Sequence, residues 1–298
     1  MLRRYAGLVV ASDVLFDDLP SASGAPDITI RRGSVDGDGW TFVQNWSDDT
    51  GDWLTIERGA AGYRLSFPEL QSVVSADGSA ITFDPPPGLA DVELAHLLLH
   101  QILPLAVSRR GRLVLHACAV ETSRGVIGLL GASGAGKSTL AAAFCARGCR
   151  LVADDALVID VSDAGATAVP TADGVRLWED FAAMLPSAAA TPPGALGRKR
   201  RIHATLATAT SPLVRLFRVG EASPLHATVE PISPADARIE MLSHVFRLDI
   251  TDADESRRLF ELTHRLAALV PLRRLMFPDG VEHLDPTVSA MLRDLETP

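Results

Sequence analysis

The chain has 298 residues, of which 47% are hydrophobic and 22% are charged, and its formal net charge is −9. This length and composition predict a globular chain with one large domain or two modest ones. Because Lys and Arg are not in excess, we predict no nucleic-acid partner. A net negative chain can still bind a nucleotide, since local hydrogen-bond donors and Mg²⁺ decide that contact.

Cysteine content and hydropathy predict a cytoplasmic chain with no membrane partner. Cys118, Cys145 and Cys149 are too few for a disulfide framework, and no His/Cys pair nearby completes a zinc site. The N-terminal apolar stretch is short and soon followed by acidic residues, so we predict no signal peptide. The longest apolar run, 94–107, is broken by polar residues and Pro104, which argues against a membrane span.

Residues 1–88 form a predicted strand-rich N-terminal region. Short β-prone segments alternate with turn clusters such as DGDG and SDDTGD. The predicted strands are residues 8–11, 28–31, 40–46, 53–58, 63–67 and 79–83. A run of three prolines within 84–91 ends this region, so we place a domain boundary at residue 88.

Residues 89–298 form the predicted catalytic domain. Its first element is a helix over 91–108, capped by Asp91 and distorted at Pro104. Strands over 112–121 and 126–131, a helix over 140–148 and a strand over 150–160 follow. Alternating strands and helices favour an α/β nucleotide-binding core.

The remaining elements are less regular. We predict strands over 166–171, 202–206, 213–219 and 270–277, and helices over 177–186, 233–245, 252–269 and 287–295. Ser233 and Asp236 form a capping-box pattern at the start of the second of these helices. Residues 191–201, rich in Pro, Gly and Arg, are predicted to be a loop.

A complete phosphate-loop motif, GASGAGKS, lies between a predicted strand and a helix. Its glycines let backbone amides turn toward phosphate oxygens, and the following helix contributes its positive end. Lys137 reaches the β- and γ-phosphates, and the Ser138 hydroxyl is a ligand for Mg²⁺. The predicted ATP-binding set is Gly131, Ala132, Ser133, Gly134, Ala135, Gly136, Lys137, Ser138 and Thr139.

Two adjacent carboxylates, Asp154 and Asp155, follow an apolar strand. One can hold Mg²⁺ and the other can orient or deprotonate an acceptor hydroxyl. Close carboxylates repel each other, which raises one pKa and suits a base. A solvated turn is the alternative interpretation. His116 lies in a predicted strand, where a lone histidine is more often structural than functional.

These segments resemble the catalytic domain of HPr kinase/phosphorylase over about residues 112–160. LHACAV, GASGAGKST and CARGCRLVADD follow in that family's order, with His116 21 residues before Lys137 and Asp155 18 after it. The resemblance implies a P-loop core of the HPr kinase/PEP carboxykinase type and a homo-oligomer. It implies Asp155 as the acceptor-activating base, His116 and Lys137 as catalytic partners, and Ser138 and Asp154 as the Mg²⁺ ligands.

Two features depart from that family. Thr139 stands where the family has Glu, and the family's glycine-rich segment with a metal-binding Glu is replaced by PTADGVRLWED, where Glu179 or Asp180 is a weak substitute. Other segments, YAGLVVASDVLFDDLP, VRLWED and VPLRRLMFP, resemble a divergent branch encoded beside ribosomal peptide pathways, including lasso peptides. That likeness implies a serine of a precursor peptide as substrate.

Residues 198–201 are the densest basic run, Arg-Lys-Arg-Arg. They suit a clamp on phosphate or on an acidic peptide, for which Lys199 or Arg200 is the candidate, and equally a solvated loop. The leading functional prediction is ATP-dependent phosphoryl transfer to a hydroxyl of a peptide or protein. A small-molecule kinase and a nucleotide-binding regulator without transfer remain alternatives.

Overall fold

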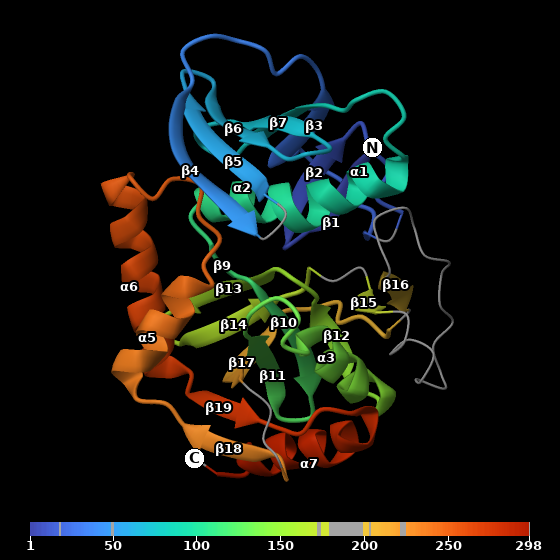
Figure 1. The fold of residues 1–298 in the computed structure, drawn as a ribbon, viewed down its shortest axis with the longest axis vertical. Helices are drawn as coiled ribbons and strands as arrows, with labels where there is room; N and C mark the ends of the chain where they lie inside the picture. The colour runs from blue at the N-terminus through green and yellow to red at the C-terminus, as the bar shows by residue number, and fades with distance from the viewer. Residues whose placement is uncertain are drawn as a thin grey trace. The chain divides into compact units, whose positions relative to one another are not determined.

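The computed structural model describes residues 1–17, 19–48, 51–171, 174–178, 199–202, 204–220 and 225–297. Within them the chain is a mixed α/β protein, which confirms the predicted class at that level (Figure 1). The chain divides into two compact units. The first comprises Met1–Val114 and Phe246–Leu259, and the second comprises Leu115–Val245 and Phe260–Pro298.

The first unit is built on a sheet that has eight strands among the residues described, in the order β1-β2-β3-β8-β7-β6-β5-β4. The pairs β2–β3 and β3–β8 are parallel, and the other neighbours are antiparallel. The strands are β1 (Leu2–Tyr5), β2 (Leu8–Ser12), β3 (Ile28–Arg32), β4 (Thr41–Asp48), β5 (Gly51–Gly59), β6 (Gly62–Ser66), β7 (Gln71–Val74) and β8 (Ala80–Asp84). The six predicted strands are all present, and β1 and β7 were not predicted.

The helical segment of the first unit is continuous: α1 (Asp91–Leu97), the π-helical η1 (Leu98–Ile102) and α2 (Leu103–Arg109). The predicted distortion is confirmed, because Pro104 has no N–H to donate and a π-helical turn immediately precedes its helix. The predicted cap is wrong by one residue. Ala90 is the N-cap, and its N–H donates to Glu93 at 3.3 Å, whereas Asp91 is already helical.

The first unit extends beyond the boundary predicted at residue 88. The proline run interrupts secondary structure there, but the helices after it pack on the preceding sheet. The Tyr5 hydroxyl donates to Leu99 O at 3.4 Å, and Arg109 Nε donates to Ala76 O at 2.8 Å. These long-range contacts place α1 to α2 in the same unit as the strands.

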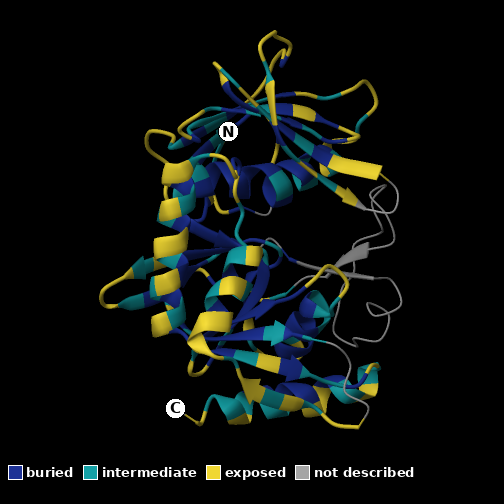
Figure 2. Ribbon diagram, turned by 60° about the vertical axis from the view of Figure 1, so that its left-hand side comes forward, coloured by how far each residue is buried: buried dark blue, intermediate teal, exposed yellow. Residues whose placement is uncertain are grey.

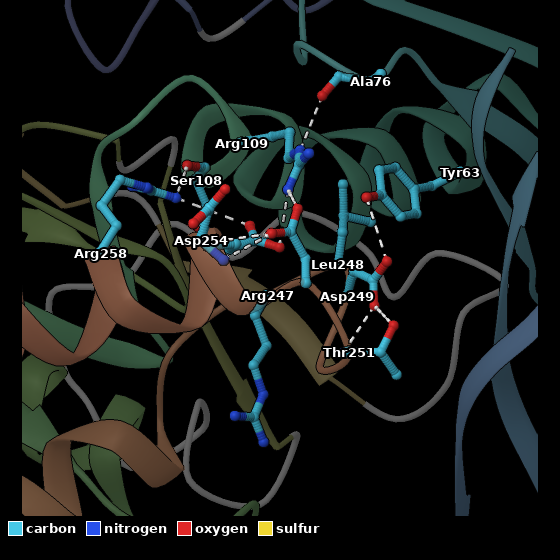
Figure 3. A network of polar contacts seen from close by, with 12 residues as sticks. Tyr63, Ala76, Ser108, Arg109, Arg247, Leu248, Asp249, Thr251, Asp254 and Arg258 are labelled. Carbon is cyan, nitrogen blue, oxygen red and sulfur yellow. Dashed lines mark hydrogen bonds and ion pairs between the residues drawn. The ribbon is translucent and has the colours of Figure 1, made fainter. Parts of the chain in front are cut away.

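A polar network holds Phe246–Leu259 in the first unit (Figure 3). Asp249, whose side chain is fully buried, accepts hydrogen bonds from Thr251 N and Oγ1 at 2.8 and 2.6 Å. Its other carboxylate oxygen accepts from Arg58 at 2.9 Å and Tyr63 at 3.3 Å. A buried carboxylate with these partners fixes the segment to the sheet.

The second unit has a mixed sheet in the order β12-β10-β11-β17-β14-β13-β9, with β19 beside β17 and β18 beside β19. The pairs β11–β17 and β17–β19 are parallel, so these three strands end at one edge. The strands are β9 (Leu113–Leu115), β10 (Ala117–Thr122), β11 (Gly125–Leu130), β12 (Arg150–Ala153), β13 (Leu157–Ser162), β14 (Gly165–Val169), β17 (Ser211–Val219), β18 (Thr228–Pro231) and β19 (Leu272–Met276).

The helices of the rest of the chain are α3 (Lys137–Ala146), α5 (Pro234–Ser243), α6 (Ala253–Leu269), the short 3₁₀ turn η2 (Val281–His283) and α7 (Leu284–Asp294). The residues of α6 up to Leu259 belong to the first unit, and the residues after it belong to the second. The predicted Ser233 cap is confirmed, because its Oγ accepts Asp236 N–H at 3.2 Å. Helix α6 buries one side and exposes the other (Figure 2), as expected for a helix with apolar residues on one face. Leu140 and Phe144 of α3 are fully buried in one cluster with Phe217 of β17.

Several predicted elements need correction. The strands predicted over 112–121 and 150–160 are each interrupted, at His116 and at Asp154–Ala156. The predicted helix over 177–186 begins as strand at Val175–Trp178 (β15), and its remainder lies outside the described residues. The basic loop ends as strand β16 (Lys199–Ile202), because its backbone pairs with β15. Among the described residues, no helix is long and apolar enough to cross a bilayer.

Candidate active site

The glycine loop, Gly131–Gly136, joins the end of β11 to the start of α3. All three of its glycines have positive φ: +149° at Gly131, +83° at Gly134 and +91° at Gly136. A Cβ on Gly131 would lie 2.9 Å from Val219 O, whereas one on Gly134 would meet nothing within 4 Å. The first glycine is therefore required by both conformation and space, and the second by conformation alone.

Lys137 is the first residue of α3, and its ammonium group turns back over the glycine loop. Nζ donates to Gly131 O at 2.7 Å and to Ala132 O at 3.0 Å. The side chain is buried, with 6% of its surface exposed. A buried cation at the N-terminal end of a helix creates a strongly positive environment for an anion.

Ser138 and Asp154 are brought together by the first turn of α3 and the end of β12. Ser138 Oγ donates to Asp154 Oδ1 at 2.9 Å, and Cys118 Sγ lies 3.0 Å from the same oxygen. Asp154 is 3% exposed. Burial first, and then the charge of Asp154, raise the pKa of the Cys118 thiol, which therefore stays protonated and donates to the carboxylate.

This donor set fits Mg²⁺. A hydroxyl and a carboxylate oxygen are hard ligands, and Mg²⁺ is normally held by one or two such groups together with substrate phosphates. In the part of the chain that the structure describes, no group of three or more His, Cys, Asp or Glu side chains is arranged to hold a metal ion. Ser138 and Asp154 would hold Mg²⁺ together with a phosphate-bearing ligand.

Asp155 has a backbone conformation that is rare for a residue with a side chain. Its φ is +114°. Main-chain bonds in both directions with Ala117, each 3.2 Å long, hold it there. Such strain costs about 1–3 kcal/mol and is concentrated at active sites. The half-buried Asp155 carboxyl is thus held apart from the regular path of the strand.

His116 occupies the interruption between β9 and β10. Burial is the largest effect on its pKa, and with the charge of Lys137 it lowers that pKa to about 4, against the opposing effect of Asp155. The imidazole also hydrogen-bonds to the Asp155 backbone. His116 therefore lies within electrostatic reach of both the Lys137 ammonium and the Asp155 carboxylate, and it is neutral at pH 7.

The structure thus brings Ser138 to Asp154, and His116 to Asp155 and Lys137. Thr139 lies half-buried in the first turn of α3, and Ala132 and Ser133 are exposed in the glycine loop. Glu179, Asp180 and Arg198 lie outside the described residues, and of Lys199–Arg201 the structure describes only the strand backbone.

Four residues near this site were not predicted from the sequence: Cys118, Arg218, Glu240 and His244. Cys118 was considered only as a disulfide or zinc candidate, and neither role was predicted for it. Glu240 and His244 are four residues apart on α5, a spacing that places them on one helix face and could have drawn attention. The position of Arg218 depends on strand pairing over a long sequence separation, for which the sequence carries no local signal.

Comparisons with known proteins add little to this geometry. No family model matches the chain, and neither does any curated protein. Among solved structures, one match is the Hpr(Ser) kinase/phosphatase from Coxiella burnetii, at 14% identity and a TM-score of 0.31, covering 62% of this chain and 99% of that one. At this TM-score the likeness supports no inference, so function has to be argued from the residues of the site.

Proposed function

We propose that this chain is an ATP-dependent kinase that transfers the γ-phosphoryl group of ATP to a hydroxyl group, with a serine of a peptide or protein as the leading acceptor. The observation that carries the proposal is the 2.9 Å contact between Ser138 Oγ and Asp154 Oδ1, beside Lys137 and a glycine loop. This combination provides an anion cradle and a pair of hard oxygen ligands in one place.

Each residue of the site has a separate proposed role in phosphoryl transfer. Loop amides and Lys137 bind the phosphates, while Ser138 and Asp154 would hold Mg²⁺. When bound, Mg²⁺ would supply neutralisation of phosphate charge. Catalysis then depends mainly on position and charge.

Asp155 is the group that receives the acceptor's proton. The acceptor oxygen forms a bond to the γ-phosphorus, the bond from that phosphorus to the bridging oxygen breaks, and ADP carries away the electron pair. The hydroxyl proton passes to the Asp155 carboxylate. Neutral His116, bonded to the Asp155 backbone, keeps the base in place without adding a competing positive charge.

The site chemistry is compatible with more than one phosphoryl acceptor. A serine of a ribosomal precursor peptide is the leading candidate, as the N-terminal and C-terminal sequence patterns suggest. A small hydroxyl metabolite requires the same site chemistry. A regulator that binds or hydrolyses ATP without transfer requires the cradle and the metal ligands but not Asp155.

The test is to incubate the protein with γ-labelled ATP, Mg²⁺ and either serine-containing peptides or hydroxyl metabolites, and to follow the label. Label in a peptide supports the leading proposal, and label in a metabolite selects the second candidate. Label only in free phosphate, at a rate unchanged in Asp155→Asn, selects the regulator. If the protein fails to bind ATP at all, the proposal is wrong.

A further inference from the structure

A second group of charged residues lies at the end of strand β17, on the sheet face opposite α3. We call Arg218, Glu240 and His244 the Arg218 cluster. Glu240 Oε1 accepts from Arg218 Nε at 3.0 Å and lies 3.2 Å from His244 Nε2. One carboxylate oxygen thus holds both an arginine from the sheet and a histidine from the end of α5.

The Arg218 cluster is next to the glycine loop through strand pairing. Arg218 pairs in parallel register with Leu130, the residue before Gly131. The following residue, Val219, has its carbonyl against Gly131. The guanidinium therefore leaves the sheet at the edge where the glycine loop begins.

Alternation along β17 decides which face Arg218 occupies. Phe217 and Val219 pack in the same buried cluster as the α3 residues. Because side chains of a strand alternate, Arg218 projects to the opposite face, where it meets Glu240 of α5. Ser138 and Asp154 thus lie on the α3 side of the sheet, and Arg218 lies on the α5 side.

His244 connects the Arg218 cluster to His116. The His116 N–H donates to His244 O at 2.7 Å, and Leu115 forms a bridge with Val245. Burial lowers the pKa of the His244 imidazole, Glu240 opposes the shift, and the charges of Lys137 and Arg218 lower it further. This imidazole is therefore within electrostatic reach of both Lys137 and Arg218.

We propose that Arg218 is a catalytic residue that binds the phosphoryl group during transfer, and that Glu240 and His244 are positioning residues that hold its guanidinium in place. This inference rests on the proposed kinase function. Charge in phosphoryl transfer spreads over three equatorial oxygens, which a planar guanidinium matches better than an ammonium. Glu240 engages the Nε edge, and 40% of the Arg218 side chain is exposed.

The ordinary explanation of such a contact is a surface ion pair, which contributes little to stability. Two features favour a functional role. The same Glu240 oxygen contacts both Arg218 and His244, and the carbonyl of His244 accepts the His116 main-chain N–H. A pair formed only for stability would need neither connection.

The test compares binding of MgADP alone with binding of MgADP plus aluminium fluoride, which mimics the transferring phosphoryl group. Arg218→Gln is expected to weaken binding of the aluminium fluoride complex by about 10²-fold or more, as loss of one donor to a transition state does. Binding of MgADP alone should stay within a few-fold of the parent, because Arg218 contacts only the third phosphoryl position.

Arg274→Gln is the matched control. Arg274 pairs directly with Arg218 on the neighbouring strand β19 and is exposed. It should leave both affinities unchanged. Arg218→Lys, which keeps the charge without the planar fork, should recover only part of the lost affinity.

Glu240→Gln tests the positioning role. It should lower affinity for the aluminium fluoride complex by a smaller factor than Arg218→Gln, while MgADP affinity and the melting temperature stay near the parent values. If Glu240→Gln lowers the melting temperature and leaves the complex unchanged, Glu240 has only a structural role.

The outcomes separate this inference from the function on which it rests. If the parent gains affinity from aluminium fluoride and Arg218→Gln gains equally, the inference fails and the kinase proposal stands. A parent that binds neither form of the nucleotide overturns both.

Discussion

At the scale of single residues, Asp155 is unusual in its backbone conformation and His116 is unusual in its pKa. Asp155 is strained, with a φ of +114°, and two main-chain bonds to Ala117 keep it so. His116 is neutral at pH 7, because burial and Lys137 lower its pKa to about 4. The strained backbone fixes the position of the Asp155 carboxyl, and the neutral imidazole places no positive charge beside it.

Replacing the base gives the first prediction. Asp155→Asn should leave the ATP dissociation constant near the parent value, because neither Ser138 nor Lys137 is touched. Phosphoryl transfer should fall by about 10²–10⁴-fold, the usual contribution of a general base. The measurement is initial-rate transfer of label from γ-labelled ATP. Asp163→Asn, at an exposed turn, is the control. Transfer by Asp155→Asn at the parent rate would exclude the base assignment.

Protonation of His116 gives the second prediction. Its pKa is lower in the folded state than the ordinary 6.5, so the unfolded state binds the proton more tightly. Stability is therefore complete above about pH 6.5 and is lost as pH falls toward 4, by up to about 3 kcal/mol from this group. Urea unfolding of the parent at pH 7 and pH 4.5 measures the loss.

His116→Gln supplies the comparison for that experiment. Other acidic and histidine groups also titrate in this range, so the parent alone does not isolate His116. The variant should lose less free energy of unfolding than the parent between the two pH values. Equal losses in the two proteins would show that His116 is not held neutral.

At the scale of elements, Gly131 and Gly134 of the glycine loop differ in the space around them, so Ala substitutions at the two positions can be compared. Gly131→Ala should destabilise the protein by about 1–3 kcal/mol and abolish ATP binding, because its Cβ would lie 2.9 Å from Val219 O. Gly134→Ala, with nothing within 4 Å, should cost only about 1 kcal/mol from its φ of +83°. Urea unfolding and ATP titration of both variants provide the check. Equal losses of unfolding free energy in the two variants would mean that the close approach of Val219 O to Gly131 has no energetic effect.

The sequence predicts the strand, loop and helix around the glycine loop well. The motif GASGAGKS and its spacing to Asp154 are local, and strand, loop and helix follow from them directly. The strands over 112–121 and 150–160 were each predicted as continuous, because apolar residues lie on both sides of His116 and of Asp154–Asp155. Where a strand pattern continues but the backbone departs from it, tertiary contacts determine the conformation.

Long-range strand and helix contacts explain why the sequence did not predict the positions of Arg218 and Glu240 or the strand β16. Arg218 reaches the edge of the glycine loop only because β17 pairs with β11, and Glu240 reaches Arg218 only because α5 lies on that face. Neither contact has a local sequence signal. The strand β16 was predicted as a loop for the same reason, since its partner β15 lies far back along the chain.

At the scale of the whole molecule, the chain leaves its first unit and returns to it, and Asp249 secures the returning segment. Burial acts to raise the pKa of this carboxyl, but hydrogen bonds from Thr251 and the charge of Arg58 outweigh burial and lower it. The carboxylate is therefore ionised and fully partnered inside the unit. Tyr63 adds a further donor from the sheet (Figure 3).

Removal of that carboxylate should destabilise the first unit. Asp249→Ala is expected to lower the free energy of unfolding by about 3–5 kcal/mol, because it leaves buried donors and a charge unpaired. Asp254→Ala, whose side chain is 90% exposed, should change it by less than about 0.5 kcal/mol. Chemical denaturation measures both. A loss no larger in Asp249→Ala than in Asp254→Ala would rule out the network as the anchor of this segment.

The central claim is that Ser138 and Asp154 hold the metal of one bound nucleotide over the glycine loop. Calorimetric titration with ATP, in the presence and absence of Mg²⁺, tests it in the parent and in Asp154→Asn. Mg²⁺ should tighten ATP binding in the parent, and Asp154→Asn should lose this Mg²⁺-dependent gain. An equal gain in the two proteins, or no binding of ATP by the parent, would contradict it.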